Sequence, residues 1–397
     1  MHRFFYNVVF AALNLVAQSS DIARLEALRK QDPADAVVLY NLAAEYASAG
    51  RQSEVLPLLR KMPVALGGLD PSVYRGFVFL HGNPEFEALV ARIRQANPPR
   101  VRSRPAFIIQ ESNLGPEGLA CDPRTRALFV GSIKRKIVRI DASGTVSDFV
   151  PVAKYGLGIV FGLRVDPLRR QLWAVNEDPE GFAKMSGGTA LNEFDIDSGN
   201  LIARYPGPAK MTGFLNDVVV EPKTGVAYAT NTSDGSIWRA VPGTSTLEMF
   251  LPPGTVLEAN GITISSDRRY LFIAGWHDIT RVEFANRDVR LLENPTRLTD
   301  ASLDGMYFYK NSLVGIQNGI HPGRVVRFWL DRSLSRVTRS EILETYNPMF
   351  DGVTTGAIDG DSFLFFANGQ LRKVRPDGSV VPGAELYPIT ILRLKLN

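Results

Sequence analysis

The spacing of apolar residues changes once along the chain, near residue 100. Between residues 20 and 98 apolar residues recur every three or four positions, as in Ile22, Leu25 and Leu28, which predicts amphipathic helices. After residue 105 short alternating runs are separated by Gly, Pro, Asp and Asn, a pattern typical of strands joined by turns. Asn97-Pro98-Pro99-Arg100 lies between the two patterns, so we place a domain boundary there.

The β-rich part, residues 105–397, repeats one layout six times: a dipeptide ending in Gly or Asp, an alternating strand, a polar turn and a second apolar strand. The repeats start 44, 55, 44, 44 and 47 residues apart, about the length of one four-stranded propeller blade. The sequence therefore predicts an all-β six-bladed β-propeller. The starts are Glu117-Gly118, Phe161-Gly162, Asn216-Asp217, Asn260-Gly261, Asp304-Gly305 and Asp351-Gly352.

One strand-like run precedes the first repeat. Ala106-Phe107-Ile108-Ile109 has no blade of its own, and the last repeat runs short of strands after Val374. We therefore predict that the early strand completes the final blade and closes the ring, which leaves no exposed edge there. The tail from Ile389 to Leu396 is also strand-like, and the sequence does not indicate where it pairs.

The helical region, residues 20–98, is punctuated by Asp32-Pro33 and Ala49-Gly50-Arg51, which delimit a helix pair over roughly 34–60. With small residues where its helices cross, this pair resembles a tetratricopeptide-type hairpin over barely one repeat. The helices either recruit a protein partner or simply pack on the propeller, and the residues leave both open.

Residues 1–19 carry a short apolar run after a single Arg, which predicts a signal peptide and thus a periplasmic or secreted protein. The alternative is a buried first helix. The run is too short for a spanning helix, so no integral membrane segment is expected in the mature chain. The net charge of +4 without a dense Lys/Arg tract disfavours nucleic-acid binding. Cys121 is the single cysteine, which excludes an intramolecular disulfide, and we expect it to pack in the core.

The six repeat starts should meet at one face, because every inner strand of a propeller begins there. Glu117, Asn216, Asn260 and Asp304 would then bring together two carboxylates and two amides. Such hard oxygen ligands, with a formal charge of −2, suit a divalent cation, and calcium best. The alternative is that these dipeptides only shape turns.

Four motifs, Pro116-Glu117-Gly118-Leu119, Leu215-Asn216-Asp217-Val218, Ala259-Asn260-Gly261-Ile262 and Leu303-Asp304-Gly305-Met306, carry a family resemblance. Over about residues 106–375 the chain resembles the senescence-marker-protein/gluconolactonase family and, more distantly, paraoxonases and diisopropylfluorophosphatase. The resemblance implies a six-bladed calcium-dependent hydrolase. It assigns Glu117, Asn216, Asn260 and Asp304 to the metal.

Loops between the second and third strands of each blade should surround this mouth and form a rim for a small-molecule substrate. Their residues are Ser132, Asn176, Glu177, Asn231, Trp276, His277, Asn318 and His321. Phe161 departs from the polar pattern and is expected to wall the cavity. Asp351 is expected either to support a ligand residue from behind or to shape a turn. Asp304, as the resemblance suggests, and His277 are the two candidate general bases.

Together these features predict calcium-dependent hydrolysis of a lactone or related ester, with the ion acting as a Lewis acid. No Gly-x-Ser-x-Gly motif of a serine hydrolase is present. The competing hypothesis is a non-catalytic ligand- or partner-binding propeller with a structural ion, because the fold alone does not define an activity. A third, a metal-free bond-forming propeller of the strictosidine-synthase kind, requires the mouth residues to point apart.

Overall fold

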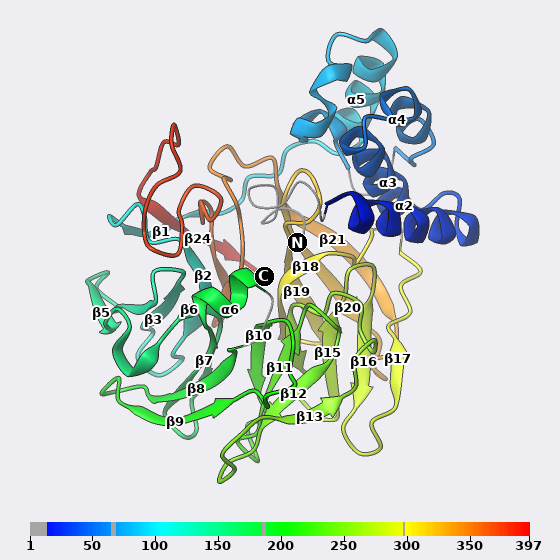
Figure 1. Cartoon of the computed structure of the whole chain (residues 1–397). Coiled ribbons are helices and arrows are strands. Elements are labelled where there is room, and N and C mark those ends of the chain that lie inside the picture. The colour runs from blue at the N-terminus through cyan, green and yellow to red at the C-terminus, as the bar shows by residue number, and fades with distance from the viewer. Residues whose placement is uncertain (1–13, 65–68, 185–187, 297) are drawn as a thin grey trace.

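The computed structural model describes residues 14–64, 69–184, 188–296 and 298–397 (Figure 1). Six four-stranded antiparallel sheets form a ring, and a group of helices sits on one end of it. The predicted six-bladed β-propeller is therefore confirmed. Within the first five blades the strands follow one another in chain order, as expected for sheets built from short hairpin connections.

The first three blades take their strands in chain order from residues 116–251. Blade one contains β2 (Pro116–Cys121), β3 (Leu128–Ser132), β4 (Lys136–Ile140) and β5 (Val146–Val150). Blade two contains β6 (Ile159–Asp166), β7 (Gln171–Glu177), β8 (Ala190–Asp195) and β9 (Leu201–Pro206), with the short helices η3 (Lys154–Gly156) and α6 (Pro179–Lys184) in its connections. Blade three contains β10 (Leu215–Val220), β11 (Ala227–Asn231), β12 (Ile237–Ala240) and β13 (Glu248–Leu251).

The last three blades include the closure of the ring. Blade four contains β14 (Ile262–Ile264), β15 (Tyr270–Ala274), β16 (Ile279–Glu283) and β17 (Val289–Leu291). Blade five contains β18 (Leu303–Tyr309), β19 (Ser312–Gln317), β20 (Arg324–Leu330) and β21 (Val337–Thr345). Blade six contains β22 (Gly356–Asp359), β23 (Ser362–Phe366), β24 (Ile389–Lys395) and β1 (Arg104–Ile109).

Blade six confirms the predicted closure by the early strand. β1 pairs antiparallel with β24, with Ile109 opposite Ile389, so the first strand of the propeller lies on the outside of the last blade. β24, the strand-like tail of the sequence, also pairs with β23 and is therefore the third strand of blade six. The chain segments before and after the ring are thereby hydrogen-bonded to each other.

The prediction that Asp351-Gly352 starts the sixth inner strand was wrong. β22 begins only at Gly356, and Asp351 lies in the preceding loop, where it forms an ion pair of 2.6 Å with Lys373. Gly352 has φ +78, so this dipeptide serves a turn. Thr355 lies against Gly305 as Asp217 lies against Gly162, which places Thr354 at the position that the prediction gave to Asp351.

The helical segment consists of α2 (Asn14–Gln31), α3 (Ala36–Ser48), α4 (Gln52–Leu59), η1 (Pro71–Val73), η2 (Arg75–Leu80) and α5 (Pro84–Ala96). α3 and α4 form the predicted pair, and Asp35 caps α3 by accepting hydrogen bonds from two backbone amides. Of the predicted signal peptide, residues 1–13 lie outside the described residues, and residues 14–19 belong to α2. No helix of the described chain has the length and apolarity needed to span a bilayer.

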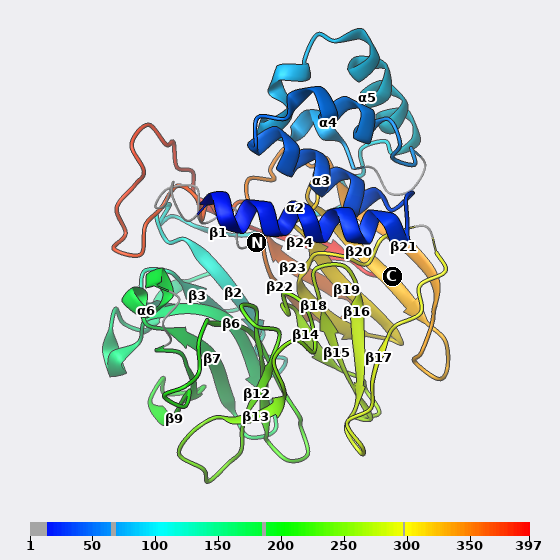
Figure 2. The same ribbon diagram turned by 45° about the vertical axis from the view of Figure 1, so that its right-hand side comes forward.

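The helices dock on the end of the propeller where the inner strands begin. Figure 2 shows α2 lying along that end, with α3, α4 and α5 stacked beyond it. Trp276 of the β15–β16 loop packs into the helical core, and the Asp70 amide donates to the His321 carbonyl at 2.8 Å. His277 Nε2 lies 2.6 Å from Asp35 Oδ2. Two loops predicted to form the substrate rim therefore hold the helices instead.

We predict that docking of the helices weakens at alkaline pH. Hydrogen bonds with Asp278 and Asp35 raise the pKa of His277 to about 10. A raised histidine pKa contributes stability that is complete below about pH 6.5 and is lost as the pH rises through about 10. The midpoint of thermal unfolding should therefore fall between pH 6.5 and 10, more in the wild type than in His277→Gln.

Comparing the wild type with His277→Gln separates the contribution of His277 from that of other titrating groups. Exposed His81→Gln provides the matched control, and it should follow the wild-type curve. Equal slopes for the wild type and His277→Gln would contradict a protonated His277 at the interface.

Candidate functional site

The inner strands meet at the axis so closely that side chains at some positions are excluded. A Cβ added to Gly118 would lie 2.1 Å from the Phe161 carbonyl oxygen, and one added to Gly261 would lie 2.5 Å from the Asp304 carbonyl oxygen. Glycine at these positions therefore lets the backbones of neighbouring blades touch. This contact explains the repeated glycine and sets the residue before it at the mouth of the channel.

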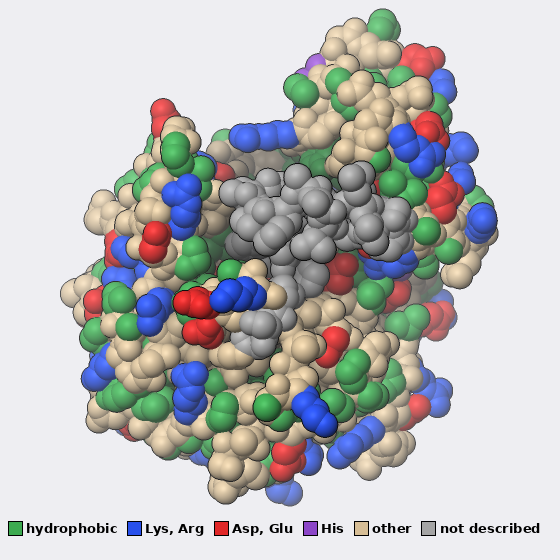
Figure 3. Space-filling model, viewed as in Figure 1, with side chains coloured by type: hydrophobic (Ala, Val, Ile, Leu, Met, Phe, Trp, Pro, Cys, Tyr) green, Lys and Arg blue, Asp and Glu red, His purple; other side chains and the backbone are tan. Residues whose placement is uncertain are grey.

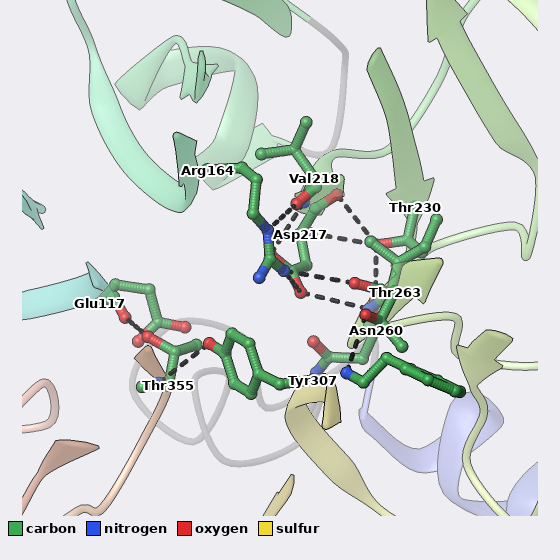
Figure 4. Close-up of polar contacts among 12 residues, drawn as sticks. Glu117, Arg164, Asp217, Val218, Thr230, Asn260, Thr263, Tyr307 and Thr355 are labelled. Atoms are coloured by element: carbon green, nitrogen blue, oxygen red, sulfur yellow. Dashed lines mark hydrogen bonds and ion pairs between the residues drawn. The ribbon is translucent and has the colours of Figure 1, made fainter. Parts of the chain in front are cut away.

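Below the mouth, Arg164 of β6 connects four blades (Figure 4). Its guanidinium donates to the carbonyls of Val218 at 3.0 Å and Ile262 at 3.3 Å, and lies 3.6 Å from a carboxylate oxygen of Asp217. It also lies 4.8 Å from the ring centroid of Tyr307. The Arg164 side chain is 19% exposed, and this many partners stabilise a charge that is largely removed from water.

The same ring of contacts continues through the remaining blades. The Tyr307 hydroxyl accepts a hydrogen bond of 3.0 Å from the Gly356 amide of blade six. The Thr355 hydroxyl then donates to the Glu117 carbonyl of blade one. Polar contacts across blade boundaries thus link all six inner strands, and the backbone of Glu117 is held at the end of this chain of contacts.

Two carboxylates at the mouth are buried, and within the described residues neither forms an ion pair. Glu117 and Asp304 are each 1% exposed. Both carboxylate oxygens of Glu117 and Oδ1 of Asp304 have no hydrogen-bond partner in the structure. Burial, and then the charges of Asp304 and Asp217, raise the pKa of Glu117 well above its usual range. Burial raises the pKa of Asp304 to about 6, although a hydrogen bond from Asn318 opposes this.

The two predicted amide ligands lie in the same network. The Asn216 amide donates to Thr232 at 3.0 Å, which fixes its orientation. A hydrogen bond with Asn260 lowers the pKa of Asp304, so these two side chains meet. The backbone carbonyl of Asn260 accepts from the Thr230 hydroxyl at 2.8 Å. The structure thus brings Asn260 and Asp304 together and places Asn216 and Glu117 at equivalent positions of their blades.

These side chains suit a hard divalent cation. The unpartnered oxygens of Glu117 and Asp304 are the kind of buried carboxylate donors that a cation would stabilise, and oxygen-only sets favour calcium over zinc. The described residues contain no group of three or more His, Cys, Asp or Glu side chains placed to hold a metal. A cation here would accordingly depend on amide, backbone or water oxygens beside the two carboxylates.

The structure places the predicted rim residues in different environments. Asn318 contacts the site directly, because its amide donates to Asp304 Oδ2. Asn176 accepts from the Gly158 amide at 2.6 Å, and Asn231 contacts the backbone of Thr212 and Ser233, so both serve their own loops. Trp276 lies under Arg24 of α2, 4.8 Å from ring centroid to guanidinium carbon. Of these four residues, Asn318 is the one whose side chain contacts a predicted metal ligand, Asp304.

Phe161 belongs to an aromatic cluster, and its expected role as a wall of the cavity stays a prediction. Its ring centroid lies 5.3 Å from that of Phe182 in α6 and 5.9 Å from that of Phe214, which precedes Asn216 by two residues. Phe182 and Phe214 also contact each other edge to face. The blade-two side of the mouth is therefore apolar, and the blade-five side carries Asp304 and Asn318.

His277, the second candidate base, is held by the helical segment and its own loop. Nε2 contacts Asp35 at 2.6 Å and Nδ1 contacts Asp278 at 3.3 Å. With a pKa of about 10 it carries a proton at neutral pH, and a protonated imidazole does not accept another. These contacts do not favour a role for His277 as general base.

Sequence reasoning missed three residues of the axis: Arg164, Asp217 and Tyr307. Asp217 had a recognisable signal, because it replaces the glycine of the other repeats. A carboxylate can occupy this position because it accepts from the Val218 amide at 2.8 Å and the Ile262 amide at 3.2 Å. Nothing in the local sequence distinguishes Arg164 from an exposed arginine, since its partners come from other blades.

No family model and no curated protein matches the chain. Among solved structures, one chain in the crystal structure of a nidogen/laminin complex is similar over 57% of this chain and 79% of its own length, with 14% identity and a TM-score of 0.45. A likeness at this level carries no argument about function. The six-bladed fold rests on the six sheets of the chain itself.

We predict that Arg164→Met destabilises the propeller by about 3–5 kcal/mol, the usual result of removing one partner of a buried pair. Asp217, which is 3% exposed, would lose its counter-charge, and the Val218 and Ile262 carbonyls would lose a donor. Urea denaturation measures the change in free energy of unfolding. Arg124→Met, at an exposed turn, serves as the control and should change it by less than about 0.5 kcal/mol.

Proposed function

We propose that this protein is a calcium-dependent hydrolase of a lactone or related ester, similar to the senescence-marker-protein/gluconolactonase family. The observation that carries the proposal is the pair of buried carboxylates, Glu117 and Asp304, of which both oxygens of Glu117 and Oδ1 of Asp304 have no hydrogen-bond partner. Such an arrangement is costly unless a cation binds there. The order Glu, Asn, Asn, Asp at the starts of the inner strands of blades one, three, four and five supports the same assignment.

The residues that would hold the ion are Glu117, Asn216, Asn260 and Asp304. When bound, calcium would supply a Lewis acid for the ester carbonyl. Asp304 is the general base of this proposal: Asn318 donates to its Oδ2 and fixes the carboxylate, while Oδ1 remains able to accept a proton from water. Oδ2 of Asp304 is thus fixed by Asn318, and Oδ1 would contact both the ion and the attacking water.

The aromatic wall supports an apolar acyl group in the substrate. Phe161, Phe182 and Phe214 line one side of the mouth, and the Asn176 and Asn231 amides that would recognise hydroxyl groups bond to backbone instead. A polyhydroxy sugar lactone would bury its hydroxyl groups against these rings without partners, at considerable cost. Aliphatic lactones fit this side of the mouth better.

We predict that calcium raises the thermal midpoint of the wild type saturably and that a chelator lowers it. Glu117→Gln removes one of the two charges and should weaken calcium binding at least about tenfold. Asp304→Asn keeps the shape beside Asn318 and should reduce turnover of a lactone by about 10²- to 10⁴-fold, because the base is lost. Calorimetric calcium titration and a pH-stat lactonase assay provide the two measurements.

Asp267→Asn, on an exposed turn at the opposite end of the propeller, is the matched control for both measurements. It should bind calcium and turn over lactones as the wild type does. Turnover that persists in the presence of chelator, or in Asp304→Asn, would refute the proposed mechanism.

A second candidate function is a non-catalytic ligand- or partner-binding propeller with a structural ion. The observation that favours it is burial: at 1% exposure, Glu117 and Asp304 offer little access to a substrate. Tight calcium binding together with no turnover of any lactone would support this alternative. Recruitment of a protein partner by the helices remains part of it, although α3 already uses Asp35 to contact the propeller.

We further predict a preference for long acyl chains that depends on Phe161. Phe161→Asn should lower kcat/KM about tenfold or more for a ten-carbon aliphatic lactone, and by no more than about twofold for a five-carbon one. Phe79→Asn, on the helical segment, is the control. Faster hydrolysis of an aldonolactone than of either aliphatic lactone by the wild type would contradict the assignment of the wall.

A further inference from the structure

A second uncompensated charge lies away from the channel, where the helices meet blade five. Arg324 begins β20 and is 1% exposed. Its Nε donates to Gln317 Oε1 at 2.7 Å, but Nη1 and Nη2 have no hydrogen-bond partner in the structure. Burial lowers the pKa of Arg324 to about 9, which leaves the guanidinium charged at neutral pH. A buried cation in this state needs an anion.

The carboxylate at this junction, Asp70, is already committed to other groups. Its Oδ2 accepts from Arg94 at 2.8 Å and from the Tyr346 hydroxyl at 2.9 Å. Its Oδ1 accepts from the amide and hydroxyl of Ser72. Across the described part of the chain, no carboxylate lies within ion-pair distance of Arg324. The protein itself therefore does not neutralise this arginine.

The helices contribute a further unpartnered donor at the same junction. Tyr40 of α3 is 4% exposed, and its hydroxyl has no hydrogen-bond partner in the structure. Its ring stacks on His321, three residues before Arg324, with centroids 6.2 Å apart. Tyr346 affects the pKa of both Tyr40 and Arg324, and it follows Thr345, the strand partner of Arg324. Both side chains thus lie within electrostatic range of Tyr346.

We propose that a small oxyanion, a carboxylate or phosphate group, binds between Arg324 of the propeller and Tyr40 of the helical segment and holds the two parts together. The two Nη groups of a guanidinium match two oxygens of such an anion in a planar, bidentate contact. The Tyr40 hydroxyl supplies a third donor from the opposite side of the junction. This site does not depend on the calcium site or on any hydrolytic activity.

Thermal unfolding of the full chain, titrated with sodium acetate and with sodium phosphate at constant ionic strength, tests the proposal. One of the two anions should raise the wild-type midpoint saturably, by about 2 °C or more at millimolar concentration. Arg324→Met should abolish the shift while folding normally, because an apolar side chain of similar length removes the uncompensated charge. Amide hydrogen exchange of α3 should slow with the anion in the wild type but not in Arg324→Met.

Two further variants make the result decisive. Tyr40→Phe keeps the ring and removes the hydroxyl, so it should weaken anion binding about tenfold even if Arg324→Met does not fold. Arg336→Met removes an exposed arginine of the same blade region, paired with Glu293, and should titrate as the wild type does. An absent shift in the wild type, or equal shifts in all four proteins, would overturn the proposal and leave buried water as the partner of Arg324.

Discussion

The close contact of six inner strands around one axis is the constraint from which the other features follow. Backbones of neighbouring blades touch at Gly118 and Gly261, so polar groups near the axis are shut off from water and must find partners in another blade. Arg164 meets this requirement for four blades at once, and Tyr307 and Thr355 extend the contacts to the sixth and first. The propeller is therefore joined by polar contacts at its centre as well as by apolar packing between blades.

The same closeness produces the candidate site. Below the mouth, Arg164 neutralises Asp217. At the mouth, Glu117 and Asp304 form no ion pair within the described residues, and three of their four carboxylate oxygens have no hydrogen-bond partner. The charge of Asp217 below the mouth is thus paired, whereas those of Glu117 and Asp304 at the mouth are not paired within the part of the chain that the structure describes. Propellers host many functions on one architecture, so this local imbalance, rather than the fold, carries the proposal of a bound calcium ion. The surface charge does not indicate where a ligand would bind, because Figure 3 shows acidic and basic side chains interspersed over the described part of the face in view.

The helices divide the face that carries the mouth into two parts. Over blades four and five, Asp35, Tyr40 and Asp70 of the helical segment contact the loops of His277 and His321, and the junction has its own uncompensated cation in Arg324. Around blade two, the mouth is bordered by Phe161, Phe182 and Phe214. Loop residues of blades four and five that we expected to contact a substrate therefore contact the helical segment. The border at blade two is apolar.

The sequence by itself determined the elements and their order: six repeats predicted six blades, and the unmatched strand Ala106 to Ile109 predicted the closure that β1 and β24 make. The prediction from local sequence was wrong at Asp351-Gly352, because an Asp-Gly dipeptide occurs both in turns and at the start of inner strands. Only the tertiary structure decided that Trp276 and His277 face helices, that Arg164 crosses the axis and that Arg324 is buried without a counter-ion. The physical reason is that periodicity records whether a side chain is buried, whereas its charge partners come from segments tens to hundreds of residues away, which no local pattern specifies.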